Sequence, residues 1–350
     1  MHTVLDAQLV DPSGREPGLR VGVRDQRREL LFDLGEIRKL SARTLLRTSH
    51  AFVSHAHMDH FAGFDHWLAL GLGRMPAMTL WGGPGFVDRV EHKLRAYTWN
   101  VVHRYPASLR IEAHSLEADG SRRAAAFDSR EAFVRRELDG TPAGDDDVLL
   151  VDPLFRVRAR IVDHEMPVLA FAIEETAQAR VAADRIAAMG FTPGPWLREL
   201  KARVLAGAAD DEPLSVSWRD AAGEHSREHR IGELRPLVLD TILGRRIGYV
   251  TDLRYTDANL AQLDALLTGA DLLHIECVFA HEDRALAAQR NHLTALQAGT
   301  IARRLGARKL VPFHFSPRYS GEEDRLREQA FAAWRCTEPG ILAPWPSPGP

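Results

Sequence analysis

One short cluster, Ser54-His55-Ala56-His57-Met58-Asp59-His60, constrains this chain more than any other part of its sequence. His55 and His57 project the same way from an extended loop, so both imidazoles can reach one ion. Asp59 and His60 follow at once and can turn to a second ion nearby. Neutral imidazole and carboxylate are the usual ligands of a catalytic zinc with an open position, and two metals roughly 3.5–4 Å apart can share a hydroxide. The cluster therefore predicts a two-metal hydrolase rather than ordinary surface or core histidines.

A two-metal site needs further ligands, and three candidates follow extended or apolar runs later in the chain. His164 follows Arg158–Val162, Asp252 follows Ile247–Val250, and His314 follows Lys309–Val311. A lone histidine at a strand end is more often structural than a ligand. Three such residues in this order after the cluster are a much stronger signal, and they indicate a site built at strand ends.

Short apolar runs alternate with segments of helical periodicity, which is typical of an α/β protein. The expected strands are 30–32, 51–53, 78–81, 247–250, 272–275 and 309–311. The expected helices are Phe61–Leu72, Pro84–Tyr97, Asp257–Leu267, Leu293–Leu305 and Glu322–Trp334. We expect a single domain over residues 1–350, since one large α/β domain can reach this length.

Three stretches stand apart from this alternation. Residues 119–147 are charged and rich in turn residues, so we expect a surface insertion with one helical piece near Ser129–Leu138. Residues 177–208 contain two expected helices on either side of Gly190-Phe191-Thr192-Pro193-Gly194-Pro195, with a net charge of +3. Residues 339–350 are rich in Pro and Gly, and we expect a frayed tail.

Composition excludes several classes of protein. The formal charge of −3 gives no global basic field of the kind that marks a nucleic-acid-binding protein. Only two cysteines occur, Cys277 and Cys336, which rules out a disulfide scaffold and a thiolate zinc site and fits a reducing compartment. Met1–Arg28 is mixed and charged, so we expect no secretory signal, and no run of the chain approaches roughly 18 apolar residues. We therefore expect a soluble cytoplasmic protein with no membrane partner.

The order of these motifs resembles ribonuclease Z, the tRNA 3′-processing branch of the metallo-β-lactamase superfamily. The similar segments are Leu31–Glu36 with its Asp-x-Gly-Glu, Asp59–Phe64, Asp163–Glu175, Thr251-Asp252 and His314–Tyr319. Gly190–Pro195 with Leu197–Lys201 resembles the Gly/Pro turn of the family's flexible arm. The chain departs from the pattern in the insertion at 119–147, which has no counterpart there, and in three shorter segments. No Gly-rich motif occurs in Met1–Arg28, Ile37-Arg38-Lys39 follows Glu36, and only the glutamate remains in Ile275-Glu276-Cys277-Val278.

This resemblance implies a fold, a metal centre and a reaction. The fold would be a four-layer αββα sandwich with an inserted helical arm. Two Zn²⁺ would bind each chain, although Mn²⁺ also suits nitrogen and oxygen ligands. One ion would be held by His55, His57 and His164, the other by Asp59, His60 and His314, with Asp252 between them. A bridging hydroxide, oriented by Asp59, would cut precursor tRNA on the 3′ side. The family also implies a homodimer.

The resemblance assigns an acid pair, Glu276 and His292, in which the carboxylate polarises a histidine that protonates the leaving oxygen. That role is reasonable, since expelling a ribose 3′-oxygen needs a proton donor near neutrality. The alternative for His292 is a surface residue at a helix N-terminus, and for Glu276 an ordinary carboxylate at a strand end.

The substrate-binding residues also have two interpretations. Arg318 either binds substrate phosphate or pairs with a structural carboxylate. The arm either clamps the RNA backbone or forms a lid or dimer contact; the residues concerned are Arg198, Lys201, Arg203, Pro193, Gly194 and Pro195. Two alternatives to precursor tRNA cleavage remain. One is hydrolysis of small phosphodiesters, esters or lactones, and the other is metal or RNA binding without turnover.

Overall fold

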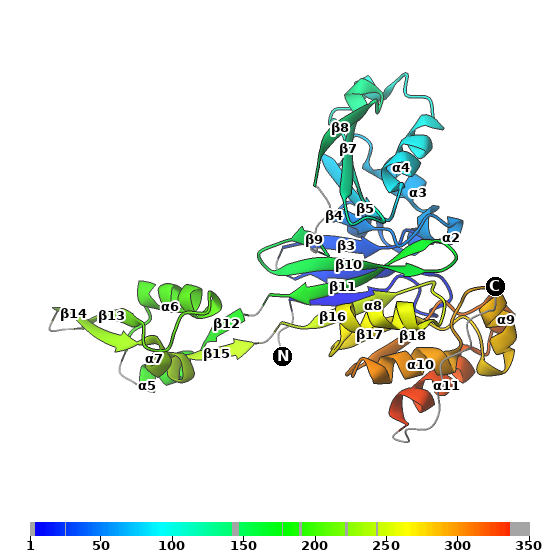
Figure 1. Cartoon of the computed structure of the whole chain (residues 1–350). Coiled ribbons are helices and arrows are strands. Elements are labelled where there is room, and N and C mark those ends of the chain that lie inside the picture. The colour runs from blue at the N-terminus through cyan, green and yellow to red at the C-terminus, as the bar shows by residue number, and fades with distance from the viewer. Residues whose placement is uncertain are drawn as a thin grey trace. The chain divides into compact units, whose positions relative to one another are not determined.

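The computed structural model describes residues 4–336, except 25, 142–146, 177, 189–190, 221–222 and 243, so the expected tail at 339–350 lies outside the described residues. The chain forms two compact units (Figure 1). The main unit comprises Met1–Glu174 and Arg246–Pro350, and the inserted unit comprises Glu175–Arg245.

The first sheet of the main unit has eight strands in the order β1 to β8. They are β1 (Leu5–Leu9), β2 (Leu19–Val23), β3 (Arg28–Phe32), β4 (Thr48–Phe52), β5 (Ala77–Gly82), β6 (Arg110–Leu116), β7 (Arg122–Asp128) and β8 (Arg135–Thr141). Strands β3 to β6 are parallel, so their carboxyl ends lie at one edge of the sheet. Asp33 and the histidine cluster follow β3 and β4 directly, at that edge.

The second sheet has six strands in the order β18-β17-β16-β11-β10-β9. They are β9 (Val148–Val151), β10 (Phe155–Asp163), β11 (Pro167–Glu175), β16 (Arg246–Val250), β17 (Leu272–Glu276) and β18 (Leu310–Phe313). Strands β16, β17 and β18 are parallel, and β11 is antiparallel to β16. The start of β11 therefore lies beside the end of β16, which brings His164 close to Asp252.

Alternating side chains divide the core of the main unit into three hydrophobic layers. In β11, Leu169 and Phe171 point between the two sheets, while Val168 and Ala170 point to the opposite face. The layer between the sheets contains the stacked rings of Phe32 and Phe52, 4.8 Å apart. Because β11 is buried on both faces, it can only be a central strand covered by helices.

Helices cover the outer face of each sheet, as Figure 1 shows. The first sheet packs on α1 (Ala42–Leu45), α2 (Met58–Phe61), α3 (Phe64–Gly71) and α4 (Phe86–Arg95). The second packs on α8 (Asp257–Leu267), α9 (Arg284–Gln289), α10 (Ala295–Arg304) and α11 (Glu323–Arg335). Short 3₁₀ turns lie at η1 (Ile37–Lys39), η2 (Val102–Arg104), η3 (Ser129–Glu131), η4 (His281–Asp283) and η5 (Pro317–Tyr319). The main unit is thus the expected four-layer αββα sandwich.

Local sequence signals explain where several of these helices begin. The Thr256 side chain accepts a hydrogen bond from Asn259 N and caps α8, which has the predicted bounds. A capping box joins Thr294 and Gln297 at the start of α10. No helix among the described residues is long and apolar enough to cross a membrane.

The expected helix at Ser129–Leu138 is wrong. Only the single turn η3 forms, because Ala132 and Phe133 adopt positive φ angles of 51° and 56° and end it. The chain then returns as β8, which pairs antiparallel with β7. Phe127 of β7 is fully buried beneath the helices, so the segment expected to be a surface insertion supplies two strands of the first sheet.

The inserted unit has its own small hydrophobic core. Its elements are β12 (Gln178–Val181), α5 (Ala183–Ala188), α6 (Pro195–Leu205), β13 (Pro213–Asp220), β14 (Gly223–Arg230), α7 (Ile231–Val238) and β15 (Leu239–Ile242). Trp196 and Leu200 of α6 pack with Val216 of β13 and with Ile231 and Leu234 of α7. Pro195 occupies the first turn of α6, where its missing N–H costs nothing. The predicted arm, residues 177–208, is the first part of this unit.

Candidate metal centre and active site

The strand ends of the two sheets bring all seven expected metal ligands together. His55, His57, His164 and Asp252 each offer a ligand atom within 4.8 Å of the others, and so do Asp59, His60 and His314. Four histidines face the carboxylate of Asp252. Its Oδ2 lies 3.5 Å from the Nε2 atoms of His55 and His60 and 3.7 Å from that of His164, and its Oδ1 lies 2.9 Å from His314 Nδ1.

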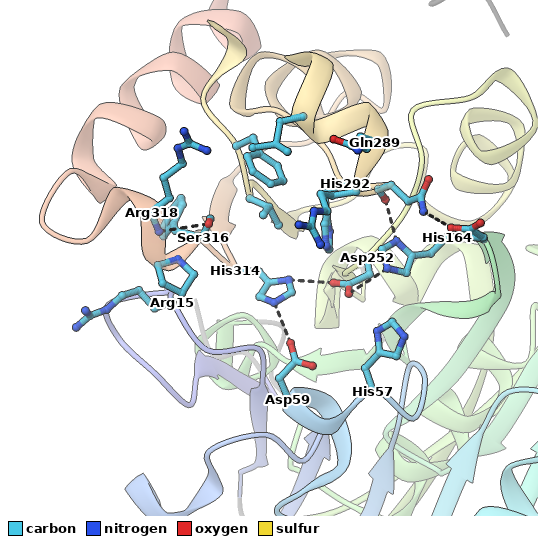
Figure 2. A pocket seen from close by; sticks show the side chains of 18 of the residues that line it. Arg15, His57, Asp59, His164, Asp252, Gln289, His292, His314, Ser316 and Arg318 are labelled. Atoms are coloured by element: carbon cyan, nitrogen blue, oxygen red, sulfur yellow. Dashed lines mark hydrogen bonds and ion pairs between the residues drawn. The ribbon is translucent and has the colours of Figure 1, made fainter. Parts of the chain in front are cut away.

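Asp59 joins the second group from the start of α2. Its Oδ2 is 3.4 Å from His60 Nε2 and 3.3 Å from His314 Nε2. Figure 2 shows His314 between the carboxylates of Asp59 and Asp252. Asp59 is half-exposed, whereas Asp252 is buried. One carboxylate is thus open to the cleft and the other is enclosed by imidazoles.

Two of these buried nitrogen atoms make no hydrogen bond among the described residues. They are His55 Nε2 and His60 Nε2, although Asp252 Oδ2 lies 3.5 Å from each. Leaving such an atom unsatisfied costs about 1–3 kcal/mol. Imidazole nitrogens and carboxylate oxygens gathered in this way match the donor set of zinc, so the residues present fit a pair of divalent metal ions.

Without metal, the charges of the cluster depend on Asp252. Burial lowers the pKa of the His55 imidazole to about 2. Burial also opposes a charge on His314, but the carboxylates of Asp252 and Asp59 outweigh it and raise its pKa to about 10. Burial would likewise raise the pKa of Asp252, yet His314 and His60 hold it well below its usual range. Asp252 is therefore charged and His55 neutral, the ionisation states that metal binding requires, whereas His314 carries a proton that a bound metal ion would displace.

Asp33 supports His60, an expected metal ligand, a role that the sequence did not reveal. The Oδ2 atom of this buried carboxylate lies 2.8 Å from His60 Nδ1 and accepts a hydrogen bond from the Tyr249 hydroxyl at 3.0 Å. Ser54 donates to Asp33 through both its backbone N–H and its hydroxyl. A proton held on Nδ1 by Asp33 leaves His60 Nε2 free for a metal. The sequence signal that could have indicated this role is the position of Asp33 directly after the apolar strand β3.

A close backbone contact explains the glycine that follows Asp33. A Cβ atom on Gly35 would lie 2.3 Å from the carbonyl oxygen of Asp59. Only glycine therefore allows the end of β3 to pack against the turn that carries Asp59 and His60. Leu34 N also donates to His60 O at 2.7 Å. The segment after β3 and the cluster from His55 to His60 are therefore packed directly against each other.

Replacing Asp33 with asparagine should weaken metal binding about 10–100-fold, the usual effect of losing an orienting carboxylate. The measurement is competition for zinc with a chelator of known affinity. Tyr249→Phe is the matched comparison, because it removes one donor to Asp33 but leaves the carboxylate, and its effect should be smaller. An unchanged zinc affinity in the Asp33→Asn variant would show that this carboxylate does not orient His60.

Asn291 connects the expected metal ligand His164 to the neighbouring His292. Its carbonyl oxygen lies 2.8 Å from His164 Nδ1, which orients the ring so that Nε2 faces Asp252. The Asn291 side chain accepts from Arg254 Nε at 2.7 Å and donates to Glu165 at 2.8 Å. The residue has a φ of 62°, a conformation that asparagine tolerates better than most residues. Neither Asn291 nor Arg254 was a sequence candidate.

The structure places Glu276 and His292 in contact, as the acid-pair prediction requires. His292 Nδ1 lies 3.1 Å from Glu276 Oε2, and Glu276 Oε1 accepts from Leu253 N at 2.8 Å. Burial lowers the pKa of His292, but the Glu276 carboxylate outweighs it and raises that pKa above the usual value. A ring atom of His292 also lies within 4.8 Å of ligand atoms of Asp252 and His314. His292 can therefore carry a proton beside the expected metal ligands.

These groups open into one cleft of about 1080 Å³, lined by His57, Asp59, His164, Asp252, His292 and His314 among others (Figure 2). Arg318 lies at its rim, half-exposed, with its Nε 3.8 Å from Asp283. That ion pair is long and exposed, so it holds Arg318 only weakly. Both interpretations of Arg318 therefore stay open: it lines the cleft where a phosphate would bind, and it lies near the structural carboxylate of Asp283.

The other expected substrate-binding residues belong to the inserted unit. Pro193, Gly194 and Pro195 line a separate pocket of about 550 Å³ together with Trp218 and His225. Arg203 is paired with Glu199 at 2.6 Å, whereas Arg198 is exposed. Residues 175–245 contain ten Lys or Arg and eleven Asp or Glu. The basic character of residues 177–208 is therefore offset by acidic side chains in the rest of the unit.

Comparison with known proteins agrees with this geometry. A family model described as the beta-lactamase superfamily domain matches residues 203–315. Ribonuclease Z from Deinococcus radiodurans is 33% identical over 87% of this chain and 86% of its own length. The ribonuclease Z proteins of Thermobifida fusca and Streptomyces coelicolor are 32% and 31% identical, over 87% of this chain and over 80% and 83% of their own lengths. With this identity along nearly the whole length of both proteins, the chain belongs to the ribonuclease Z family of the metallo-β-lactamase superfamily.

Proposed function

We propose that this protein is a zinc-dependent endoribonuclease that cuts precursor tRNA on the 3′ side and leaves a 3′-hydroxyl on the tRNA body. One observation carries the proposal: Asp252 faces four histidines within 3.7 Å, and His292, held through Nδ1 by the buried Glu276, lines the same cleft. The first arrangement suits two metal ions and the second suits protonation of a leaving alkoxide. The family's name supports the choice of RNA as substrate.

The side chains have distinct parts in this reaction. His55, His57 and His164 would hold one zinc, and Asp59, His60 and His314 the other, with Asp252 shared. Bound there, the zinc ions would activate water and neutralise charge that develops on the phosphate. Asp59, the exposed carboxylate, is placed to accept a proton from the attacking water. His292, held through Nδ1 by Glu276, is placed to give a proton to the ribose 3′-oxygen as it leaves.

A substrate panel tests this proposal against its alternatives. The zinc-loaded protein should cleave precursor tRNA at one site and release a product with a 3′-hydroxyl. A small chromogenic phosphodiester should be hydrolysed more slowly, and a lactone not at all. Cleavage of the lactone but not of RNA would instead identify a small-molecule hydrolase. Two bound zinc ions without turnover of any substrate would identify a binding protein.

The inserted unit offers a second test, because phosphate contacts dominate affinity for nucleic acid. Replacing Arg198 and Lys201 together with alanine should raise KM for precursor tRNA about tenfold or more, with kcat unchanged, since a charged hydrogen bond is worth about 1.5–3 kcal/mol. The dependence of binding on salt concentration should also become shallower, by about one unit of slope per lost contact. Hydrolysis of the small phosphodiester should not change.

The matched control is Lys309→Ala. It removes one exposed cation at the end of β18 that lies away from His314, and should leave both activities as they are. Equal precursor tRNA kinetics in the double variant and the wild type would mean that these two cations do not bind RNA. The resemblance also implies a homodimer, which light scattering of the purified protein measures directly.

A further inference from the structure

The loop between β1 and β2 is organised around one carboxylate. Buried Asp11 accepts hydrogen bonds from the backbone N–H groups of Ser13, Arg15 and Glu16 and from the Ser13 hydroxyl. Lys39 of η1 pairs with it at 3.0 Å. Both partners lie in segments where the chain departs from the family's sequence pattern. The two departures are thus a single structural feature, in which an aspartate and a lysine support the loop.

This loop is attached to the strand end that carries a metal ligand. The carbonyl oxygen of Gly14 accepts from His314 N at 2.5 Å and from Phe315 N at 3.3 Å. Gly14 has a φ of 76°, and a Cβ atom there would lie 3.0 Å from the Phe315 ring. The Arg327 guanidinium donates to Ser13 O and lies over the Phe315 ring, 4.8 Å from its centre. The position of the loop relative to the metal centre is therefore set by several independent contacts.

The next residue, Arg15, extends from this fixed loop along the cleft. Arg15 and Arg318 line the same cleft, and Figure 2 shows both on one side of it, with His314 between Arg15 and His292. Arg15 Nη1 donates to Ser320 at 3.1 Å, and its Nε lies 3.6 Å from Glu323. Its Nε also donates to the Ser13 hydroxyl at 3.3 Å. The side chain is 48% exposed, and Nη2 makes no hydrogen bond with the described residues. Arg290, also exposed, lines the cleft as well.

We propose that Arg15 binds a backbone phosphate of the 3′ trailer, beyond the phosphodiester that is cut. The proposal rests on the endoribonuclease function above. His292 marks the side of the tRNA body, because it protonates the 3′-oxygen that stays with the tRNA. Arg15 lies on the other side of His314 from His292, which is the side that we assign to the 3′ trailer. A planar guanidinium with free donors suits a phosphate better than a base edge or a sugar. The cleft also contains acidic side chains, such as Glu16 and Glu165, which repel the RNA backbone. A fixed cation at Arg15 would offset this repulsion.

The test compares Arg15→Ala with wild type on precursor tRNAs that differ in trailer length. A trailer of one nucleotide has no phosphate beyond the scissile one, whereas a trailer of four has three. With the longer trailer, Arg15→Ala should raise KM about tenfold and leave kcat unchanged. With the one-nucleotide trailer and with a small chromogenic phosphodiester, the variant and the wild type should be equal. Arg15→Lys, which keeps the charge but not the fork, should fall between them.

A measurement of bound zinc keeps the outcomes separate. Zinc content should stay at two per chain in Arg15→Ala, since a disturbed loop would act through Gly14 and His314 and lower it. Equal loss of activity on every substrate, or loss of zinc, would mean that Arg15 supports the loop and binds no trailer. Wild-type kinetics of the variant on the long trailer would also overturn the proposal. Failure of the wild type to cut any RNA would instead overturn the endoribonuclease function itself.

Discussion

Replacing Asp252 with asparagine should reduce bound zinc from two ions per chain to at most one and lower cleavage of precursor tRNA about a thousandfold. The asparagine side chain is almost the same size as that of aspartate, but it is uncharged and has one fewer oxygen with which to bind the two metal ions. Four histidine nitrogens within 3.7 Å would then face a neutral amide. Losing the metals removes several kcal/mol of charge stabilisation in the transition state, and about 4 kcal/mol corresponds to a thousandfold in rate.

Elemental analysis of the dialysed protein measures the zinc, and a gel assay with labelled precursor measures cleavage. Asp257→Asn is the matched control. It makes the same chemical change on the exposed first turn of α8 and should keep both ions and full activity. Circular dichroism should show the same secondary structure in both variants. Two zinc ions and wild-type cleavage in Asp252→Asn would contradict the central place given to this carboxylate.

Replacing His292 with alanine should lower kcat by about 10²–10⁴-fold, the usual contribution of a general acid. Zinc content should stay at two per chain, because His292 is assigned to the leaving oxygen and not to a metal. Glu276→Gln should have a smaller effect, since glutamine can still hold the His292 ring through a hydrogen bond. Rapid-quench measurement of a single turnover isolates the chemical step from product release.

The zinc content of the His292→Ala variant decides between two roles. A ring nitrogen of His292 lies within 4.8 Å of Asp252 and His314, so geometry alone would also allow a metal ligand. Loss of one zinc ion would show that His292 is a ligand and would remove the acid assignment. His103→Ala, which removes an exposed histidine of η2, is the control and should behave as wild type.

The cluster of expected metal ligands could be predicted because its residues occur in short, local patterns. The cluster from His55 to His60 is contiguous, and His164, Asp252 and His314 each follow an extended run. Parallel strands place their carboxyl ends at one edge, so strand-end residues far apart in the sequence meet. The six expected strands and five expected helices were predictable for the same reason, since each rests on a local period of apolar residues; other strands, including β1, β2 and β6 to β8, were not expected.

Other features depend on contacts that no local pattern contains. Asp33 acts by reaching His60 and Tyr249, and Asn291 acts through a backbone carbonyl 127 residues from His164. The full extent of the inserted unit, to Arg245, was missed because α7 and the β13–β14 hairpin complete a core with α6 only in three dimensions. The segment at 129–138 was misread because two residues with positive φ end its helix after one turn.

The inserted unit also affects how the chain folds. It forms the whole connection between two neighbouring antiparallel strands, β11 and β16, and β16 leads directly to Asp252. A disordered connection of that length would cost about 2–3 kcal/mol more closure entropy than a short hairpin turn. Once folded, the unit instead holds its two ends together, with Glu175 N donating to Arg245 O at 2.9 Å. It therefore acts as a large, structured turn, so a segment without any metal ligand helps to lower the entropic cost of placing the carboxylate at the centre of the site.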